Sequence, residues 1–155
     1  MDDLDFAGSY GMKLKRKPSM DVESYSANPV DDETAELAEE LLLAATAFHK
    51  LHLKIKDLGS YAAHKALNEL YSALPDHVDA LVEGYQGASE RIIKCGHESS
   101  LKSLNTVEEA VSYIRELCGE ICELQSMMPY SEIVNDLDTI KSTFNSAKYK
   151  LLFLK

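Results

Sequence analysis

Apolar residues recur every three or four positions from about residue 31 to the end of the chain. This spacing places them on one face of an α-helix. The first run has its apolar positions at Leu37, Leu41, Ala44, Phe48, Leu51 and Ile55. Asp31 or Asp32 is expected to cap the start of this helix. Gly59 is expected to end it, because glycine readily adopts the left-handed conformation of a helix cap.

A second helix is predicted to begin at Ser60. The same helical period continues through and beyond Pro75, which favours one bent helix over two separate ones. Its apolar positions are Tyr61, Ala63, Leu67, Tyr71, Leu74, Val78, Leu81, Tyr85 and Ile92.

Two more helices are predicted after a connection around residues 95–100. Thr106 and Glu109 have the spacing of a capping box, which indicates a helix start. The third helix then buries Val107, Val111, Ile114, Leu117, Ile121 and Leu124. The Met128-Pro129-Tyr130 segment breaks this helix, and Ser131 is expected to cap a fourth. The fourth helix has its apolar stripe at Ile133, Leu137, Ile140, Phe144, Ala147 and Leu151.

Four amphipathic helices without an alternating strand pattern predict an all-α four-helix bundle. Short turns at Leu58-Gly59 and Pro129-Tyr130 make two antiparallel pairs, and a longer connection between the pairs gives a ferritin-like topology. At 155 residues the chain is expected to form one domain. Residues 31–155 are assigned to the bundle. Residues 1–30 are predicted to be a flexible, extended N-terminal arm, because glycine, proline and serine interrupt any periodic pattern there.

The formal net charge is −10, which argues against a DNA-binding surface over the whole molecule. An acidic field would instead attract cations such as Fe²⁺. No apolar run approaches the roughly 20 residues of a membrane span, and no secretory signal is recognisable, so we expect no membrane association and a cytoplasmic location. Three cysteines give no disulfide framework, and Cys118 and Cys122 are expected to be small apolar core residues.

A small basic cluster lies within the predicted arm, at Lys13, Lys15, Arg16 and Lys17. It could contact phosphates and give a salt-dependent affinity for DNA. Flanking acidic residues offset much of its charge, which favours a solvated tail. Repetition of the arm on an assembled shell would strengthen weak DNA binding through multivalency.

Four potential metal ligands lie between residues 51 and 87: His52, His64, Asp79 and Glu83. Asp79 and Glu83 are one helical turn apart, so both carboxylates project from one helix face. His64 and Asp79 are 15 positions apart on one predicted helix, a separation of roughly 22 Å. One metal ion bound by all four residues therefore requires histidines from one subunit and carboxylates from another.

This pattern resembles the Dps-like mini-ferritins of the ferritin superfamily, which protect DNA in starved cells. In that family two histidines, at the end of the first helix and early in the second, face an Asp and a Glu of the two-fold-related neighbour. The resemblance implies that His52 and His64 ligate from one side and Asp79 and Glu83 from the other, as the catalytic metal ligands. It also implies oxidation of Fe²⁺ by peroxide or dioxygen, with Fe³⁺ stored in a hollow dodecamer built on two-fold dimers. Family members often use a lysine-rich N-terminal extension to hold DNA, which in this chain points to the basic cluster.

Two imidazoles and two carboxylates suit Fe²⁺, with Zn²⁺ and Mn²⁺ as competitors. The chain lacks the Glu-x-x-His pairs of other di-iron bundles, which counts against an ordinary ferritin. Asn68 stands where family members often carry an acidic residue, and Leu53 where they often carry an aromatic one. Two alternatives therefore stay open. One is a non-catalytic structural or scaffold shell protein that has lost the ferroxidase chemistry, and the other is a small helical adaptor whose histidines and acids are coincidental.

Overall fold

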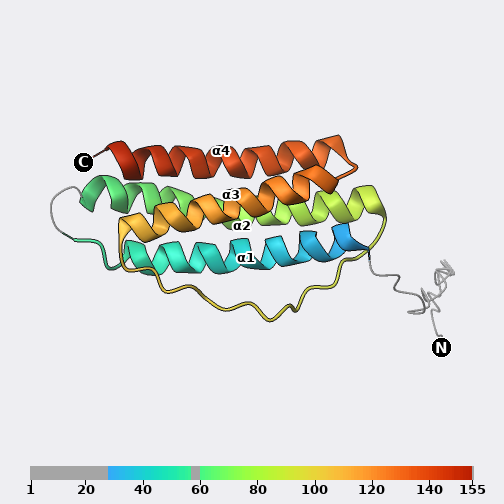
Figure 1. Cartoon of the computed structure of the whole chain (residues 1–155), viewed down its shortest axis with the longest axis horizontal. Coiled ribbons are helices and arrows are strands. Elements are labelled where there is room, and N and C mark those ends of the chain that lie inside the picture. Colours follow the sequence, from blue (N-terminus) through green and yellow to red (C-terminus); the bar gives the residue numbers. More distant parts are fainter. Residues whose placement is uncertain (1–27, 57–59, 155) are drawn as a thin grey trace, which may run out of the picture.

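The computed structural model describes residues 28–56 and 60–154, and within them it contains four α-helices and no strand. The helices are α1 (Pro29–His52), α2 (Ser60–Ser89), α3 (Val107–Met127) and α4 (Ser131–Phe153). The predicted all-α four-helix bundle is therefore confirmed (Figure 1). Within the described helices, none is apolar over enough of its length to cross a membrane. Most of the predicted arm, with its basic cluster, lies outside the described residues.

The helices form two antiparallel pairs, α1 with α2 and α3 with α4 (Figure 1). A long non-helical crossover, residues 90–106, runs back beside α1 from the end of α2 to the start of α3. α1 packs against α2 and α3, and α4 packs against the same two helices. A bundle with one long crossover has the connectivity of ferritin-like folds, as the sequence predicted.

The core consists of apolar side chains from all four helices. The predicted stripes of α3 and α4 are buried, apart from the half-buried Val107 at the start of α3. Two residues assigned to the apolar stripe of the second helix do not lie in the core: Tyr61 is 76% exposed and Ile92 is 74% exposed. Tyr61 lies in the first turn of α2, and Ile92 lies beyond the helix end at Ser89. The largest fully buried side chains include Leu41, Phe48, Leu67, Leu74, Leu81, Tyr85, Ile114, Leu117, Ile121 and Phe144.

The first helix begins and ends earlier than its sequence suggested. Asn28 is its N-cap, with its side-chain oxygen accepting a hydrogen bond from the Val30 backbone N–H at 3.1 Å. Pro29 follows at the first helical position, where its missing N–H leaves no hydrogen bond unmade. The expectation that Asp31 or Asp32 caps the helix is therefore wrong. The helix ends at His52, before Gly59, which lies outside the described residues.

Pro75 lies inside α2, which continues as one helix as predicted. Thr106 caps α3 by accepting from the Glu109 backbone N–H at 3.1 Å, and Glu109 in turn accepts from the Asn105 N–H at 2.6 Å. The predicted cap at Ser131 is wrong, because Tyr130 occupies that position without a side-chain hydrogen bond.

The two cysteines predicted to lie in the core do not both do so. Cys118 on α3 is half-buried, but Cys122, one turn further along the same helix, is exposed. The core positions are taken by Leu117 and Ile121, each directly before one of these cysteines and both fully buried. Cys122 therefore faces away from the bundle interior, and the core prediction is wrong for it.

A buried ionic cluster joins the start of α1 to the end of α2. Asp31 is only 5% exposed. Its Oδ1 accepts hydrogen bonds from the Tyr85 hydroxyl at 2.5 Å and from Arg91 Nη2 at 2.8 Å, and its Oδ2 accepts from Arg91 Nε at 3.1 Å. The Arg91 hydrogen bonds outweigh the effect of burial and hold the pKa of the Asp31 carboxyl below its usual value.

This lowered pKa predicts a loss of stability in acid. The stabilisation is present above the unfolded-state pKa of about 3.9 and is lost as the pH falls from there through the folded pKa. We expect the free energy of unfolding of wild type to fall more steeply below about pH 4 than that of Asp31→Asn. Denaturant titrations between pH 3 and pH 7 check this, and parallel profiles for the two proteins would contradict it.

Candidate functional site

The structure brings the two predicted histidines together where α1 meets α2. His52 is the last residue of α1 and is buried, whereas His64 lies in the second turn of α2 and is half-buried. Their rings stack, with centroids 3.7 Å apart and planes inclined by 24°. The His52 Nδ1 lies 3.0 Å from the His64 carbonyl oxygen, and the His64 Nδ1 lies 3.3 Å from the His52 carbonyl oxygen. Each imidazole is thus held by the backbone of the other residue.

These contacts decide which ring nitrogen can serve as a ligand. A carbonyl oxygen only accepts hydrogen bonds, so each Nδ1 carries the ring proton and donates a hydrogen bond to that oxygen. The lone pair of the neutral ring then lies on Nε2. Histidines that bind metals are commonly oriented by such a bond from their other nitrogen to a backbone carbonyl. Both Nε2 atoms are therefore suited to coordinate a cation.

Further rings surround the pair. His49, which sequence reasoning did not select, stacks on Tyr71 with centroids 4.0 Å apart, and His52 meets the same tyrosine edge-on at 5.3 Å. The signal for His49 was its position one turn before His52 on the same helix. The Tyr71 hydroxyl donates to the Asn68 side-chain oxygen at 2.8 Å. Asn68, at the position where the resembled family often carries an acidic residue, is thus an amide whose oxygen already accepts a hydrogen bond.

Asp79 and Glu83 lie on the outer face of α2. Both are exposed, and neither has a hydrogen bond or ion pair within the part of the chain that the structure describes. The helix is continuous between His64 and Asp79, so the separation of roughly 22 Å expected from the helical rise holds. The described residues of one copy contain no group of three His, Cys, Asp or Glu side chains able to hold a metal. One copy therefore supplies two nitrogens at one place and two carboxylates at another.

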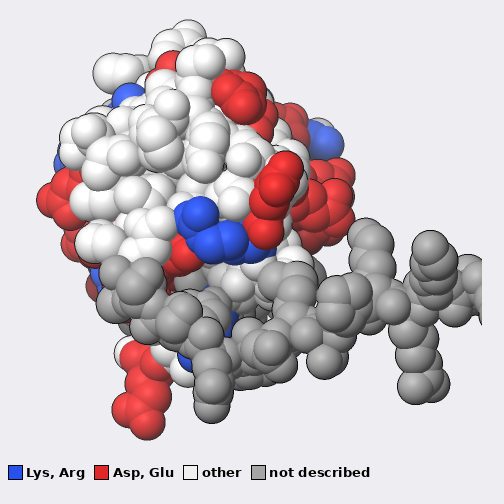
Figure 2. All heavy atoms as spheres, turned by 90° about the vertical axis from the view of Figure 1, so that its right-hand side faces the viewer, with Lys and Arg blue, Asp and Glu red and all other residues white. Residues whose placement is uncertain are grey.

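An acidic hollow of about 370 Å³ lies between α1, α3 and the crossover. On the end of the bundle where α1 begins, acidic side chains lie mainly toward the two sides of the visible face, with basic side chains between them (Figure 2). Burial, and then the neighbouring Glu40 carboxylate, raise the pKa of Glu120. Sequence reasoning missed this hollow, because its lining comes from three distant segments. The lining includes Glu33, Glu36, Glu40, His97, Glu98, Glu120 and Glu123.

A family model described as "Family of unknown function (DUF5856)" matches residues 52–151. The chain belongs to this DUF5856 family. The matched region begins at His52 and contains all four candidate ligands. A relative from Enterobacteria phage T4, the "Uncharacterized 14.6 kDa protein in mobD-ri intergenic region", is 32% identical over 113 residues, which cover 72% of this chain and 82% of the relative. No solved structure matches the chain.

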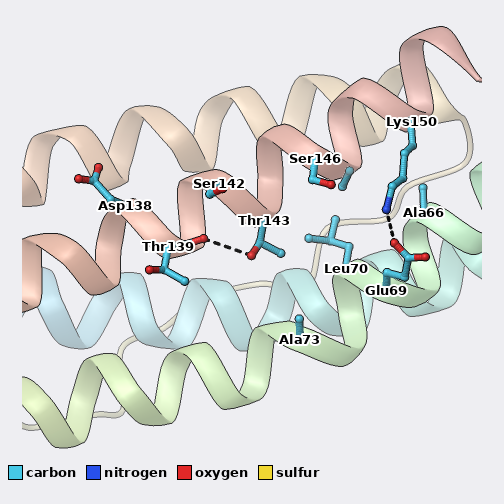
Figure 3. Close-up of a pocket in the computed structure, with 11 residues that line it drawn as sticks. Ala66, Glu69, Leu70, Ala73, Asp138, Thr139, Ser142, Thr143, Ser146 and Lys150 are labelled. Atoms are coloured by element: carbon cyan, nitrogen blue, oxygen red, sulfur yellow. Dashed lines mark hydrogen bonds and ion pairs between the residues drawn. The ribbon is translucent and has the colours of Figure 1, made fainter.

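This DUF5856 protein also has a groove of about 560 Å³ between α2 and α4 (Figure 3). Small side chains such as Ala66, Ala73 and Ser146 line it, and an ion pair between Glu69 and Lys150 crosses one end. Its lining contains neither histidine nor cysteine. The polar side chains of the groove are carboxylates, hydroxyls and the Lys150 ammonium, so the histidine pair is the better candidate for a transition-metal site in this family member.

Proposed function

We propose that two copies of this chain bind Fe²⁺ at shared sites and oxidise it, as a Dps-like ferroxidase of the cytoplasm. The observation that carries the proposal is the contact between His52 and His64, whose Nδ1 atoms are committed to backbone carbonyls. The Nε2 atoms of His52 and His64 then bind the iron from one copy. The exposed carboxylates of Asp79 and Glu83, which have no partner in the described part of their own copy, bind it from the other copy.

A two-fold axis satisfies this arrangement. For His64 of one copy to face Asp79 and Glu83 of the other, the two α2 helices run antiparallel and the axis crosses them near Ser72, about midway along the helix. The same operation creates a second, identical site. Each dimer therefore contains two sites.

The donor set suits iron in both oxidation states. Imidazole nitrogens bind Fe²⁺, and carboxylate oxygens favour the harder Fe³⁺ that oxidation produces. Two Fe²⁺ substrate ions give one electron each to hydrogen peroxide, which takes up two protons and leaves as two waters. The Fe³⁺ product then passes into the hollow of a dodecamer assembled from two-fold dimers. The basic cluster of the N-terminal arm adds a weak, salt-dependent contact with DNA.

Iron-dependent consumption of hydrogen peroxide tests the activity. We expect His52→Ala and Glu83→Ala each to lower the rate by about tenfold or more, since each removes a ligand. Glu132→Ala, an exposed acid on α4, is the matched control and is expected to leave the rate unchanged. Equal rates in wild type and both ligand variants would contradict the enzymatic role, and a monomeric protein would exclude a shared site.

A non-catalytic shell protein is the second candidate. It is favoured by Asn68, whose side-chain oxygen is occupied by the Tyr71 hydroxyl and which lacks the charge of a carboxylate. An assembled particle that binds Zn²⁺ or Co²⁺ but leaves peroxide unconsumed would support this candidate. Asn68→Asp would then be expected to raise iron oxidation above the wild-type rate.

A further inference from the structure

A stripe of exposed polar residues runs along the outer face of α2. Lys65, near the start of the helix, carries its positive charge, and acidic residues carry its negative charge further along. Lys65, Asp79 and Glu83 have no ion pair within the described part of the chain. Charges elsewhere on the surface do pair, as Glu69 does with Lys150. The stripe consists of Lys65, Ser72, Asp76, Asp79 and Glu83.

The order of these charges fits a second copy of the chain. In an antiparallel two-fold pairing the basic end of each stripe faces the acidic end of the other, and this happens twice in each dimer. A parallel pairing would bring like charges together. The adjoining stripe of α1 adds apolar area to such an interface, with Leu42 45% exposed and Leu53 73% exposed. His49 lies on the same stripe by helical spacing and stacks on Tyr71 of α2, so the stripe borders α2.

We propose that Lys65 of each copy pairs with Asp79 and Glu83 of the other while the site holds no metal. This inference rests on the proposed two-copy site. With the axis near Ser72, the position opposite Lys65 is about residue 80, between the two carboxylates. Lys65 also follows His64 directly on α2, so its long side chain starts beside a proposed ligand. A lysine suits this position because its flexible stem lets the charge move away.

The pairing gives the lysine two effects on the site. Without metal, it neutralises two carboxylates that lie one turn apart on the partner helix and repel each other, and so it stabilises the dimer. When a divalent cation arrives, the cation and the ammonium compete for the same oxygens. Metal binding therefore releases Lys65 to solvent.

A charge swap tests the pair in the full-length, metal-free protein. Sedimentation in EDTA measures the dimer dissociation constant. We expect Lys65→Glu and Glu83→Lys each to weaken the dimer by about tenfold or more, because each reversal places like charges opposite each other at two symmetric positions. The double variant Lys65→Glu/Glu83→Lys is expected to return to within about threefold of wild type. Lys148→Glu on α4 is the control and is expected to leave the dimer unchanged.

Lys65 and Glu83 are exposed, so these variants are expected to fold, which circular dichroism checks. A double variant no better than the single ones, or a Lys65→Glu dimer as tight as wild type, would overturn the inference. Co²⁺ absorption spectra of wild type report the metal site separately. If the double variant restores the dimer but wild type binds no Co²⁺, the result would support the ion pair and contradict the proposed function. Co²⁺ binding between copies without rescue would contradict the ion pair alone.

Discussion

Asp31→Ala is expected to lower the free energy of unfolding by about 2–4 kcal/mol. The substitution removes the acceptor for the Tyr85 hydroxyl, which is 1% exposed, and the partner of the Arg91 guanidinium. An unsatisfied buried hydroxyl costs about 1–3 kcal/mol by itself. The lost ion pair adds less than a fully buried one would, because the Arg91 side chain is 46% exposed.

Urea unfolding at pH 7, followed by circular dichroism, measures this change. Asp32→Ala is the matched control, because Asp32 is the next residue, carries the same charge and is exposed. We expect it to change stability by less than about 0.5 kcal/mol. A similar loss in the two variants would show that the helix dipole, rather than the buried cluster, is responsible.

The second large effect is expected when two inactive variants are mixed. One variant carries His52→Ala and His64→Ala, and the other carries Asp79→Ala and Glu83→Ala. Each alone lacks half of the ligands at every shared site and is expected to bind no Co²⁺. After the two are mixed and allowed to exchange subunits, a heterodimer has one site with all four ligands and one site with none.

Random exchange makes about half of the dimers heterodimers, so Co²⁺ binding is expected to recover to about a quarter of the wild-type capacity. Wild type mixed with either variant is expected to keep half of the wild-type capacity whether or not subunits exchange, so it gives the reference for capacity. A site made within one copy would give no recovery at all. The experiment therefore tests the division of ligands between copies independently of any oxidation chemistry.

The helices could be predicted because each buries one regular apolar stripe. Leu137, Ile140 and Phe144 of α4 illustrate this, since their burial follows from local spacing alone. The meeting of His52 and His64 was also within reach of the sequence, because a short connection between antiparallel helices brings the end of one beside the start of the next.

The features that sequence reasoning missed depend on distant segments. Asp31 is a residue type that is common at helix N-caps, but Asn28 caps the helix instead. The partners of Asp31 are Tyr85 and Arg91, which lie 54 and 60 residues away in the sequence. Tyr61 fits the apolar period of α2 but lies in the first turn, where no neighbouring helix covers it. The acidic hollow needs the crossover to lie against α1, where Glu39 accepts a hydrogen bond from the His97 N–H at 2.9 Å. No local pattern encodes that docking.

The long crossover between α2 and α3 has a consequence for the folding pathway. Each helical hairpin closes through its own short connection, so the contacts next to that connection form between residues close in the chain. Such local contacts form quickly, and the late, slow event is the docking of the α1–α2 hairpin on the α3–α4 hairpin. All four candidate ligands belong to the first hairpin, which emerges first from the ribosome. The second hairpin contributes rigidity to the ligands rather than chemistry.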